Sequence, residues 1–305
     1  MKRSSISTHR ARQLITAINS AHLDRSNYKT LQSQINELFQ GYALKGMSLA
    51  QDQMIYRGRV MAGKPSSIDE LKAPPAEAVK GFQRCNSPGN PMFYGGFVLG
   101  AIFAEVIGPD TSDGKIFVSR WVAPEGFFAV ELLPKENQAE MDTSRTQAIV
   151  DTFIETKFVG RVHETYSNDY KVTAAIAEKA LSGSLSEEAN DGFPITPKEG
   201  EGLGCIIYPS VQATGRGPNV AMIPSYANRH LIPDCVEEIH FRRKSEESFE
   251  INRIDYAKPS LTDNTLVWTG KQLHWTVDSG STATVGVEGG QYVVRDESGK
   301  TVLSP

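Results

Sequence analysis

The chain has 305 residues, of which 39% are hydrophobic and 22% are charged, and its formal net charge is -4. These values are typical of a soluble globular protein and disfavour a disordered chain or a basic protein that binds nucleic acid directly. No apolar run approaches the ~18 residues of a membrane-spanning helix, and no apolar segment follows Met1–Ser5. We therefore expect a cytoplasmic protein without membrane contacts.

The N-terminal segment predicts helices up to about Leu49. Leu31, Ile35, Leu38 and Phe39 recur at the spacing of one helix face, after a capping candidate at Ser26 or Asn27.

From Met54 to about Ile223, short apolar runs that are typical of strands alternate with helical patterns. The strand-like runs include Ile116–Val118, Ala129–Leu133 and Gly204–Tyr208. The segment Ser182–Gly204 is rich in Ser, Glu, Gly and Pro, and we expect a solvated loop there.

Beyond Asp234, β patterns dominate and are separated by turns at Gly289-Gly290 and Ser298-Gly299. The expected strands cover Leu266–Trp268, Leu273–Val277, Val285–Val287 and Tyr292–Val294. The pattern as a whole predicts an α+β protein with three parts. These parts are an N-terminal helical extension over residues 1–50, a main domain over residues 51–233 and a β-rich antiparallel appendage over residues 234–305.

The sequence carries no signature of a metal centre or of a common nucleotide-binding loop. Cys85, Cys205 and Cys235 are far apart and lack C-x-x-C spacing, so we expect reduced thiols, and the six histidines form no H-E-x-x-H motif. The motifs G-x-x-x-x-G-K-[ST] and G-x-S-x-G are absent, and Gly200–Gly204 precedes a strand as a flexible loop would. We therefore expect chemistry without a metal.

Two arginines follow a short apolar run. Arg57 and Arg59 come after Met54-Ile55, as cations carried into a cleft by a strand would. The planar donor fork of a guanidinium suits a pyrophosphate, although the same pattern also fits a surface strand.

A Pro- and Gly-rich segment containing Arg84 predicts a rigid, irregular connection before Tyr94. It leads into a helical stretch over Val98–Ile107, in which Glu105 shares an apolar stripe with Ile102. A carboxylate in that position is half exposed at the edge of the stripe, paired with an arginine for packing, or tuned for catalysis.

Ser210 follows the strand-like run that ends at Tyr208-Pro209. Proline after an apolar strand indicates a strand end, where ligands are commonly bound. A single serine carries no further information.

Together these segments resemble the RES-domain family, whose better-known members are bacterial NAD-consuming toxins. The resemblance extends from about Met54 to Ile223, and the motifs occur in the family's order. They are Leu71-x-Ala73-Pro74-Pro75, Arg84-x-Asn86-x-Pro88-Gly89-x-Pro91-x-x-Tyr94, Ala104-Glu105-Val106 and Tyr208-Pro209-Ser210, with Asn219 downstream.

The resemblance implies an ADP-ribosyltransferase-like core of small packed sheets with flanking helices, and NAD as the substrate. The implied site residues are Arg57, Arg84, Tyr94, Glu105 and Ser210, with Asn219 in support and Arg59 as a less certain neighbour. Glu105 would stabilise the positive charge that develops on the ribose as nicotinamide leaves. Arg57 and Arg84 would hold the pyrophosphate, and Tyr94 would stack on the nicotinamide or ribose. Ser210 would position the ribose as a hydrogen-bond donor, since it lacks the base that a serine nucleophile needs.

The sequence departs from the family pattern beside two of these residues. Gly95-Gly96 stands where the family has Leu-Ala, and Cys85 stands where an aromatic residue or Ala is usual. We expect both changes to affect the wall of the pocket.

Three functions follow from the resemblance. The first is a toxin that cleaves NAD with water or phosphate as acceptor and is neutralised by a helix-turn-helix antitoxin or immunity protein. The second is a protein ADP-ribosyltransferase, in which the terminal segments recognise a target. The third is a catalytically silent module that binds nucleotides, which the complete Arg/Tyr/Glu/Ser set disfavours.

Overall fold

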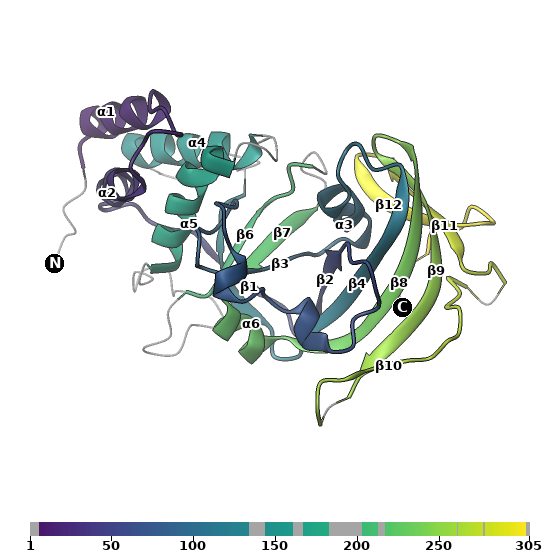
Figure 1. Cartoon of the computed structure of the whole chain (residues 1–305). Helices are drawn as coiled ribbons and strands as arrows, with labels where there is room; N and C mark the ends of the chain where they lie inside the picture. The colour runs from purple at the N-terminus through teal and green to yellow at the C-terminus, as the bar shows by residue number, and fades with distance from the viewer. Residues whose placement is uncertain are drawn as a thin grey trace.

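The computed structural model describes residues 6–133, 144–160, 167–182, 203–212, 217–260, 262–276 and 278–302. Within these ranges the chain forms six α-helices and twelve β-strands (Figure 1), which confirms the predicted mixture of α and β structure. The helices are α1 (Thr8–Asn19), α2 (Tyr28–Leu38), α3 (Leu99–Val106), α4 (Arg145–Val159), α5 (Lys171–Ser182) and α6 (Pro224–His230). The strands are β1 (Gly46–Leu49), β2 (Gln53–Arg59), β3 (Phe93–Gly96), β4 (Asp113–Ala123), β5 (Phe127–Glu131), β6 (Cys205–Pro209), β7 (Pro218–Met222), β8 (Ile232–Ser245), β9 (Ser248–Pro259), β10 (Leu266–Trp268), β11 (Thr282–Glu288) and β12 (Gln291–Asp296).

The described strands join one hydrogen-bonded sheet, in the order β1-β5-β6-β7-β3-β2-β4-β8-β9-β11-β12, with β10 beside β9. The predicted core of small packed sheets thus takes the form of one continuous hydrogen-bonded network. Its weakest junction is that between β2 and β3, where Tyr56 and Gly96 are the one aligned pair, whereas β2 and β4 are aligned from Gln53 to Arg59. The two halves of the sheet can therefore splay apart next to this junction.

Alternate residues of the central strands pack on opposite sides of the sheet, as the pleat requires. Ile206 and Ala221 pack on one side with residues of α1, α2, α4 and α5. Ile207 and Val220 pack on the other side in a cluster that includes residues of α6. Burial of each large apolar side chain contributes roughly 1.5–3 kcal/mol, so both clusters stabilise the sheet that carries the site.

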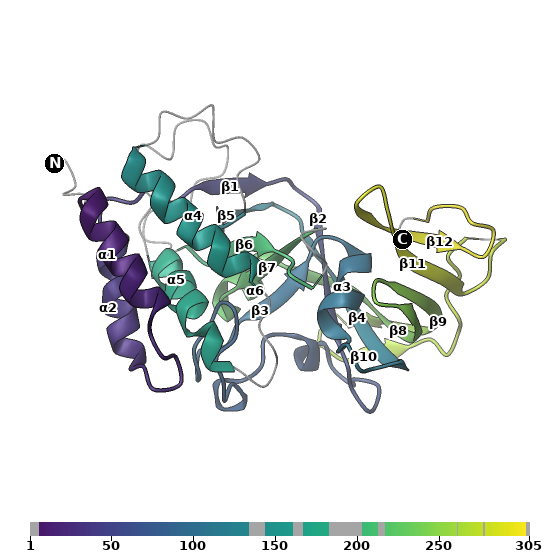
Figure 2. The same cartoon turned by 90° about the horizontal axis from the view of Figure 1, so that it is seen from above.

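The two N-terminal helices lie against α4 and α5, as Figure 2 shows from above. Of the two capping candidates, Asn27 caps α2, and its side chain accepts a hydrogen bond from the backbone N–H of Lys29 at 2.9 Å. The predicted stripe of Leu31, Ile35 and Leu38 is buried, which confirms it as the packing face of α2.

The prediction of helix up to Leu49 is wrong at its end. Gly46–Leu49 forms the edge strand β1, which pairs with β5. Four residues are too few for a period of two to be distinguished from other patterns, and the strand depends on its distant partner for its hydrogen bonds.

The C-terminal strands extend the main sheet, although the sequence suggests a separate appendage. β8 pairs with β4 from Asp113 to Val122, and β11 and β12 form a hairpin closed by the predicted turn at Gly289-Gly290. Both turn glycines have positive φ values, 56° and 81°, which a side chain would disfavour.

The predicted strand at Leu273–Val277 is wrong for its described residues, and Val277 lies outside them. The backbone N–H of Trp275 donates to the carbonyl of Gly280 at 2.9 Å, so the chain turns here. Most of the predicted loop Ser182–Gly204 also lies outside the described residues. Among the described helices, none combines the length and the apolar character needed to cross a membrane.

Helix α3 confirms the helix predicted over Val98–Ile107 and packs tightly on both sides. A Cβ atom on Gly58 of β2 would lie 2.6 Å from Ile102 Cγ2, and one on Gly100 would lie 2.9 Å from Tyr292 Cβ in β12. These close approaches show that the sheet and the C-terminal hairpin together fix the position of α3.

Candidate functional site

A cavity of about 410 Å³ opens at the weak junction between β2 and β3. Strands β2, β3, β6 and β7 contribute residues to it, together with α3, the loop before β3 and the short 3-10 helix η4 (Ser167–Tyr170). Five of the predicted site residues line this cavity. They are Arg57, Arg84, Tyr94, Glu105 and Asn219.

Glu105 is held by two neutral donors that come from the end of β6 and from the adjacent strand β7. Its Oε1 accepts a hydrogen bond from Ser210 Oγ and another, of 2.8 Å, from Asn219 Nδ2. Ser210 is fully buried directly after β6, and Asn219 is buried on β7. Within the described part of the chain, Glu105 Oε2 accepts no hydrogen bond, so one carboxylate oxygen is fixed while the other can face a ligand.

Ser210 therefore does not lie where a donor to the ribose was expected. It does not line the cavity, and its hydroxyl proton is donated to Glu105. This geometry makes Ser210 a group that orients the carboxylate, because the same proton cannot be donated to a ribose hydroxyl at the same time.

The side chain of Arg57 lies between β2 and β3, where the two strands diverge. Its Nη1 donates to the carbonyl of Tyr94, and its Nε donates to the carbonyl of Leu71 at 2.9 Å. The guanidinium also lies 5.0 Å from the ring centroid of Phe93. Burial, aided by repulsion from Arg59, lowers the pKa of Arg57 to about 9, so the side chain remains a cation at neutral pH.

Arg84 lies at the C-terminal end of α4. It donates to the carbonyls of Phe158 and Gly160 at 3.0 and 3.2 Å, where the helix dipole favours a cation. Its guanidinium also lies 5.2 Å from the ring centroid of Tyr170. Among the described residues, neither Arg84 nor Arg57 has a carboxylate partner, so no carboxylate neutralises either charge at the cavity.

Four aromatic side chains line the cavity, and three of them were not assigned a role from the sequence. They are Phe82, Tyr94, Tyr170 and Tyr208. Tyr94 Oη donates to Asn86 Oδ1 and accepts from the backbone N–H of Cys85, so its hydroxyl is used to brace the preceding loop. Burial raises the pKa of Tyr94 and of Tyr208 well above the usual value, which keeps both hydroxyls protonated.

Arg59 and Cys85 do not line the cavity. Arg59 donates to the backbone carbonyls of Glu70 and Lys72 and so braces the turn that follows β2. Cys85 is buried in the cluster under α4 and α5, which corrects the expectation that its side chain forms the pocket wall. Its thiol, like those of Cys205 and Cys235, is free and buried.

Steric crowding explains why residues 95 and 96 are both glycine. A Cβ atom on Gly96 would lie 3.2 Å from Asn219 Oδ1 and 3.1 Å from Ile102 Cδ1, whereas one on Gly95 would lie 2.7 Å from Ile55 Cγ2. Glycine at residue 96 thus leaves room for the amide that holds Glu105.

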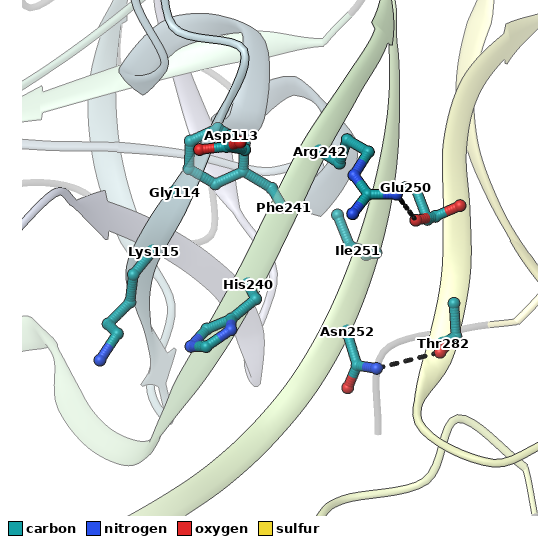
Figure 3. Close-up of a pocket in the computed structure, with 10 residues that line it drawn as sticks. All are labelled: Asp113, Gly114, Lys115, His240, Phe241, Arg242, Glu250, Ile251, Asn252 and Thr282. Atoms are coloured by element: carbon teal, nitrogen blue, oxygen red, sulfur yellow. Dashed lines mark hydrogen bonds and ion pairs between the residues drawn. The ribbon is translucent and has the colours of Figure 1, made fainter.

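A second cavity of about 550 Å³ is an open groove over β4, β8, β9 and β11 (Figure 3). Its charged side chains are largely paired, since Arg242 contacts Glu250 and Lys115 contacts Glu238. None of the residues predicted for the site lines it. We therefore place the candidate site in the smaller cavity, where Glu105 meets two arginines that contact no carboxylate in the described part of the chain.

The close packing of α3 on β2 gives a prediction. Gly58→Ala should lower the free energy of unfolding by about 1–3 kcal/mol, because the added methyl group overlaps Ile102 and Ile116. Denaturant unfolding measures this loss. Gly63→Ala is the matched control, since a Cβ atom there meets nothing within 4 Å and should change stability by less than about 0.5 kcal/mol. Equal effects of the two substitutions would contradict the packing described for α3.

Comparisons with known proteins leave the family open. Neither models of known protein families nor curated protein sequences gave a significant match to the chain. The resemblance to the RES-domain family stays a hypothesis that rests on the motif residues and on their arrangement around the cavity.

Proposed function

We propose that the chain is an NAD-consuming enzyme that cleaves the bond between nicotinamide and ribose, with water or phosphate as the acceptor. One observation carries this proposal. Glu105 is oriented by Ser210 and Asn219 at a cavity that also presents two arginines, neither of which has a carboxylate partner among the described residues. The volume of about 410 Å³ lies within the range of roughly 300–1,000 Å³ that is usual for small-ligand sites.

The residue types fit the charges of NAD and of its transition state. The pyrophosphate is an anion, and the guanidinium groups of Arg57 and Arg84 are cations suited to hold it. As the bond to nicotinamide breaks, positive charge builds on the ribose, and the free oxygen of Glu105 would stabilise it. The aromatic rings of Tyr94, Tyr170 and Phe82 offer stacking surfaces for the flat bases of the dinucleotide.

In this mechanism Ser210 and Asn219 act through Glu105. Their donors hold Oε1 and so direct Oε2, which restricts the carboxylate to one orientation before the substrate arrives. Tyr208, whose raised pKa keeps its hydroxyl protonated, lines the cavity as a further donor. We further propose that the strands around the β2–β3 junction correspond to an ADP-ribosyltransferase-like core, and that a toxin-antitoxin setting accounts for the enzyme's regulation.

The test is to incubate the purified chain with NAD and to follow free nicotinamide together with the mass of the other product. We expect nicotinamide with ADP-ribose if water is the acceptor, or with ADP-ribose 1-phosphate if phosphate is. ADP-ribose attached to protein would favour the ADP-ribosyltransferase alternative. NAD that binds but stays intact under all these conditions would indicate a silent binding module and overturn the proposal.

A further inference from the structure

The N-terminal helix α2 contacts the wall of the cavity through Tyr28. The ring of Tyr28 packs on that of Phe82, with centroids 4.8 Å apart, and Phe82 lines the cavity two residues before Arg84. The N-terminal extension thus reaches a residue that a ligand would touch.

The hydroxyl of Tyr28 makes a second connection to the same loop. It donates to Glu178 Oε2 on α5 at 2.8 Å, and Gln32 Nε2 donates to the same oxygen at 2.9 Å. The other oxygen, Oε1, accepts from the backbone N–H and the hydroxyl of Ser87. Glu178 therefore bridges α2 to the loop that carries Phe82 and Arg84.

The connection between α1 and α2 is also fixed close to Phe82. Lys171 Nζ donates to the carbonyls of Leu23 and Ser26 and lies 5.6 Å from the ring centroid of Phe82. Lys171 directly follows Tyr170, whose ring lies beside Arg84 in the cavity. Phe82 is thus contacted by Tyr28 of α2 and by Lys171, which itself holds the connection between α1 and α2.

We propose that Tyr28 is a positioning residue for the ligand site, which it acts on through Phe82 and through the bridge from Glu178 to Ser87. It sets the wall that carries Phe82 and Arg84 and does not itself touch the ligand. This proposal rests on the proposed function for its ligand, NAD, although the contact with the loop is independent of any ligand.

The test compares Tyr28→Leu with Tyr42→Leu. Tyr42 is a matched control, because it also belongs to the N-terminal segment and donates its hydroxyl to a helix carboxylate, Asp151 of α4, at 2.6 Å, but it does not line the cavity. Tyr28→Leu should raise the KM for NAD on the order of 10-fold and change kcat by less than about 3-fold, since it loosens binding and leaves Glu105 in place. Tyr42→Leu should leave the KM for NAD unchanged, even if it lowers the thermal stability of the protein as much as Tyr28→Leu does.

Hydrogen–deuterium exchange of residues 79–90 without nucleotide gives a readout that does not depend on the function. We expect faster exchange of this loop in Tyr28→Leu and in Ser87→Ala, and unchanged exchange in Tyr42→Leu. Ser87→Ala also keeps the test decisive if Tyr28→Leu does not fold. Unchanged exchange in Ser87→Ala and in any folded Tyr28 variant, or equal acceleration by the Tyr42 variant, would overturn the proposal. If the variants exchange faster but the protein neither binds nor cleaves NAD, the coupling between Tyr28 and the loop stands and only the proposed function is rejected.

Discussion

Replacement of Glu105 by glutamine should reduce the release of nicotinamide from NAD on the order of 10²- to 10⁴-fold. The amide keeps the size of the side chain, and its oxygen can still accept the hydrogen bonds of Ser210 and Asn219. It lacks the negative charge that would stabilise the ribose cation, so kcat should fall much more than KM rises. Initial rates at varied NAD concentration measure both quantities.

Glu250→Gln is the control for the loss of one carboxylate. Glu250 is partly exposed and paired with Lys244 and Arg242 at the surface, where such pairs contribute little. Glu250→Gln should release nicotinamide at the wild-type rate. If Glu105→Gln released nicotinamide as fast as the wild type, Glu105 would be rejected as the group that stabilises the ribose cation. The proposal that the chain cleaves NAD would still stand.

The largest expected effect on stability is at Arg253, whose side chain is fully buried. Its Nη2 donates to Glu237, and its guanidinium lies 4.3 Å from the ring centroid of Trp275. Arg253→Met leaves the buried carboxylate of Glu237 without this partner and should cost about 3–5 kcal/mol at neutral pH. Denaturant unfolding at pH 7 measures the loss.

The same variant should show a distinct pH dependence. Burial already raises the pKa of Glu237 in the folded protein, and the loss of Arg253 removes the main opposing influence. A carboxyl whose folded pKa lies above its unfolded pKa binds more protons when folded, so stability decreases as pH rises through that interval. The deficit of Arg253→Met relative to wild type should therefore be smaller at pH 5 than at pH 8. Adding Glu237→Leu should restore much of the lost stability, and a deficit that is independent of pH and of Glu237 would contradict this explanation.

The sequence predicts best those elements whose pattern is local. The helix over Leu99–Val106 follows from its apolar stripe, and the hairpin turn at Gly289-Gly290 follows from the need for positive φ. Strand β1 depends on a distant partner, β5, which no local window contains. The long pairing of β8 with β4 was missed for the same reason. The turn around Trp275 is closed locally by Gly280, but the apolar residues beside it match a strand pattern.

The site shows the same division between local and distant information. The carboxylate of Glu105 stands out because it interrupts an apolar stripe, whereas its partners Ser210 and Asn219 lie more than 100 residues away. Phe82 and Tyr170 had no signal of their own in a single sequence, because aromatic residues are as common in cores as in binding sites. Their place follows only from the contacts with Tyr28 and Arg84.

The most direct test of the central claim is a crystal structure of Glu105→Gln grown with saturating NAD. We predict the dinucleotide in the cavity at the β2–β3 junction, with its pyrophosphate on Arg57 and Arg84 and the ribose that carries nicotinamide beside residue 105. NAD bound instead in the groove over β4, β8 and β9, or a cavity that stays empty at saturating NAD, would contradict the account.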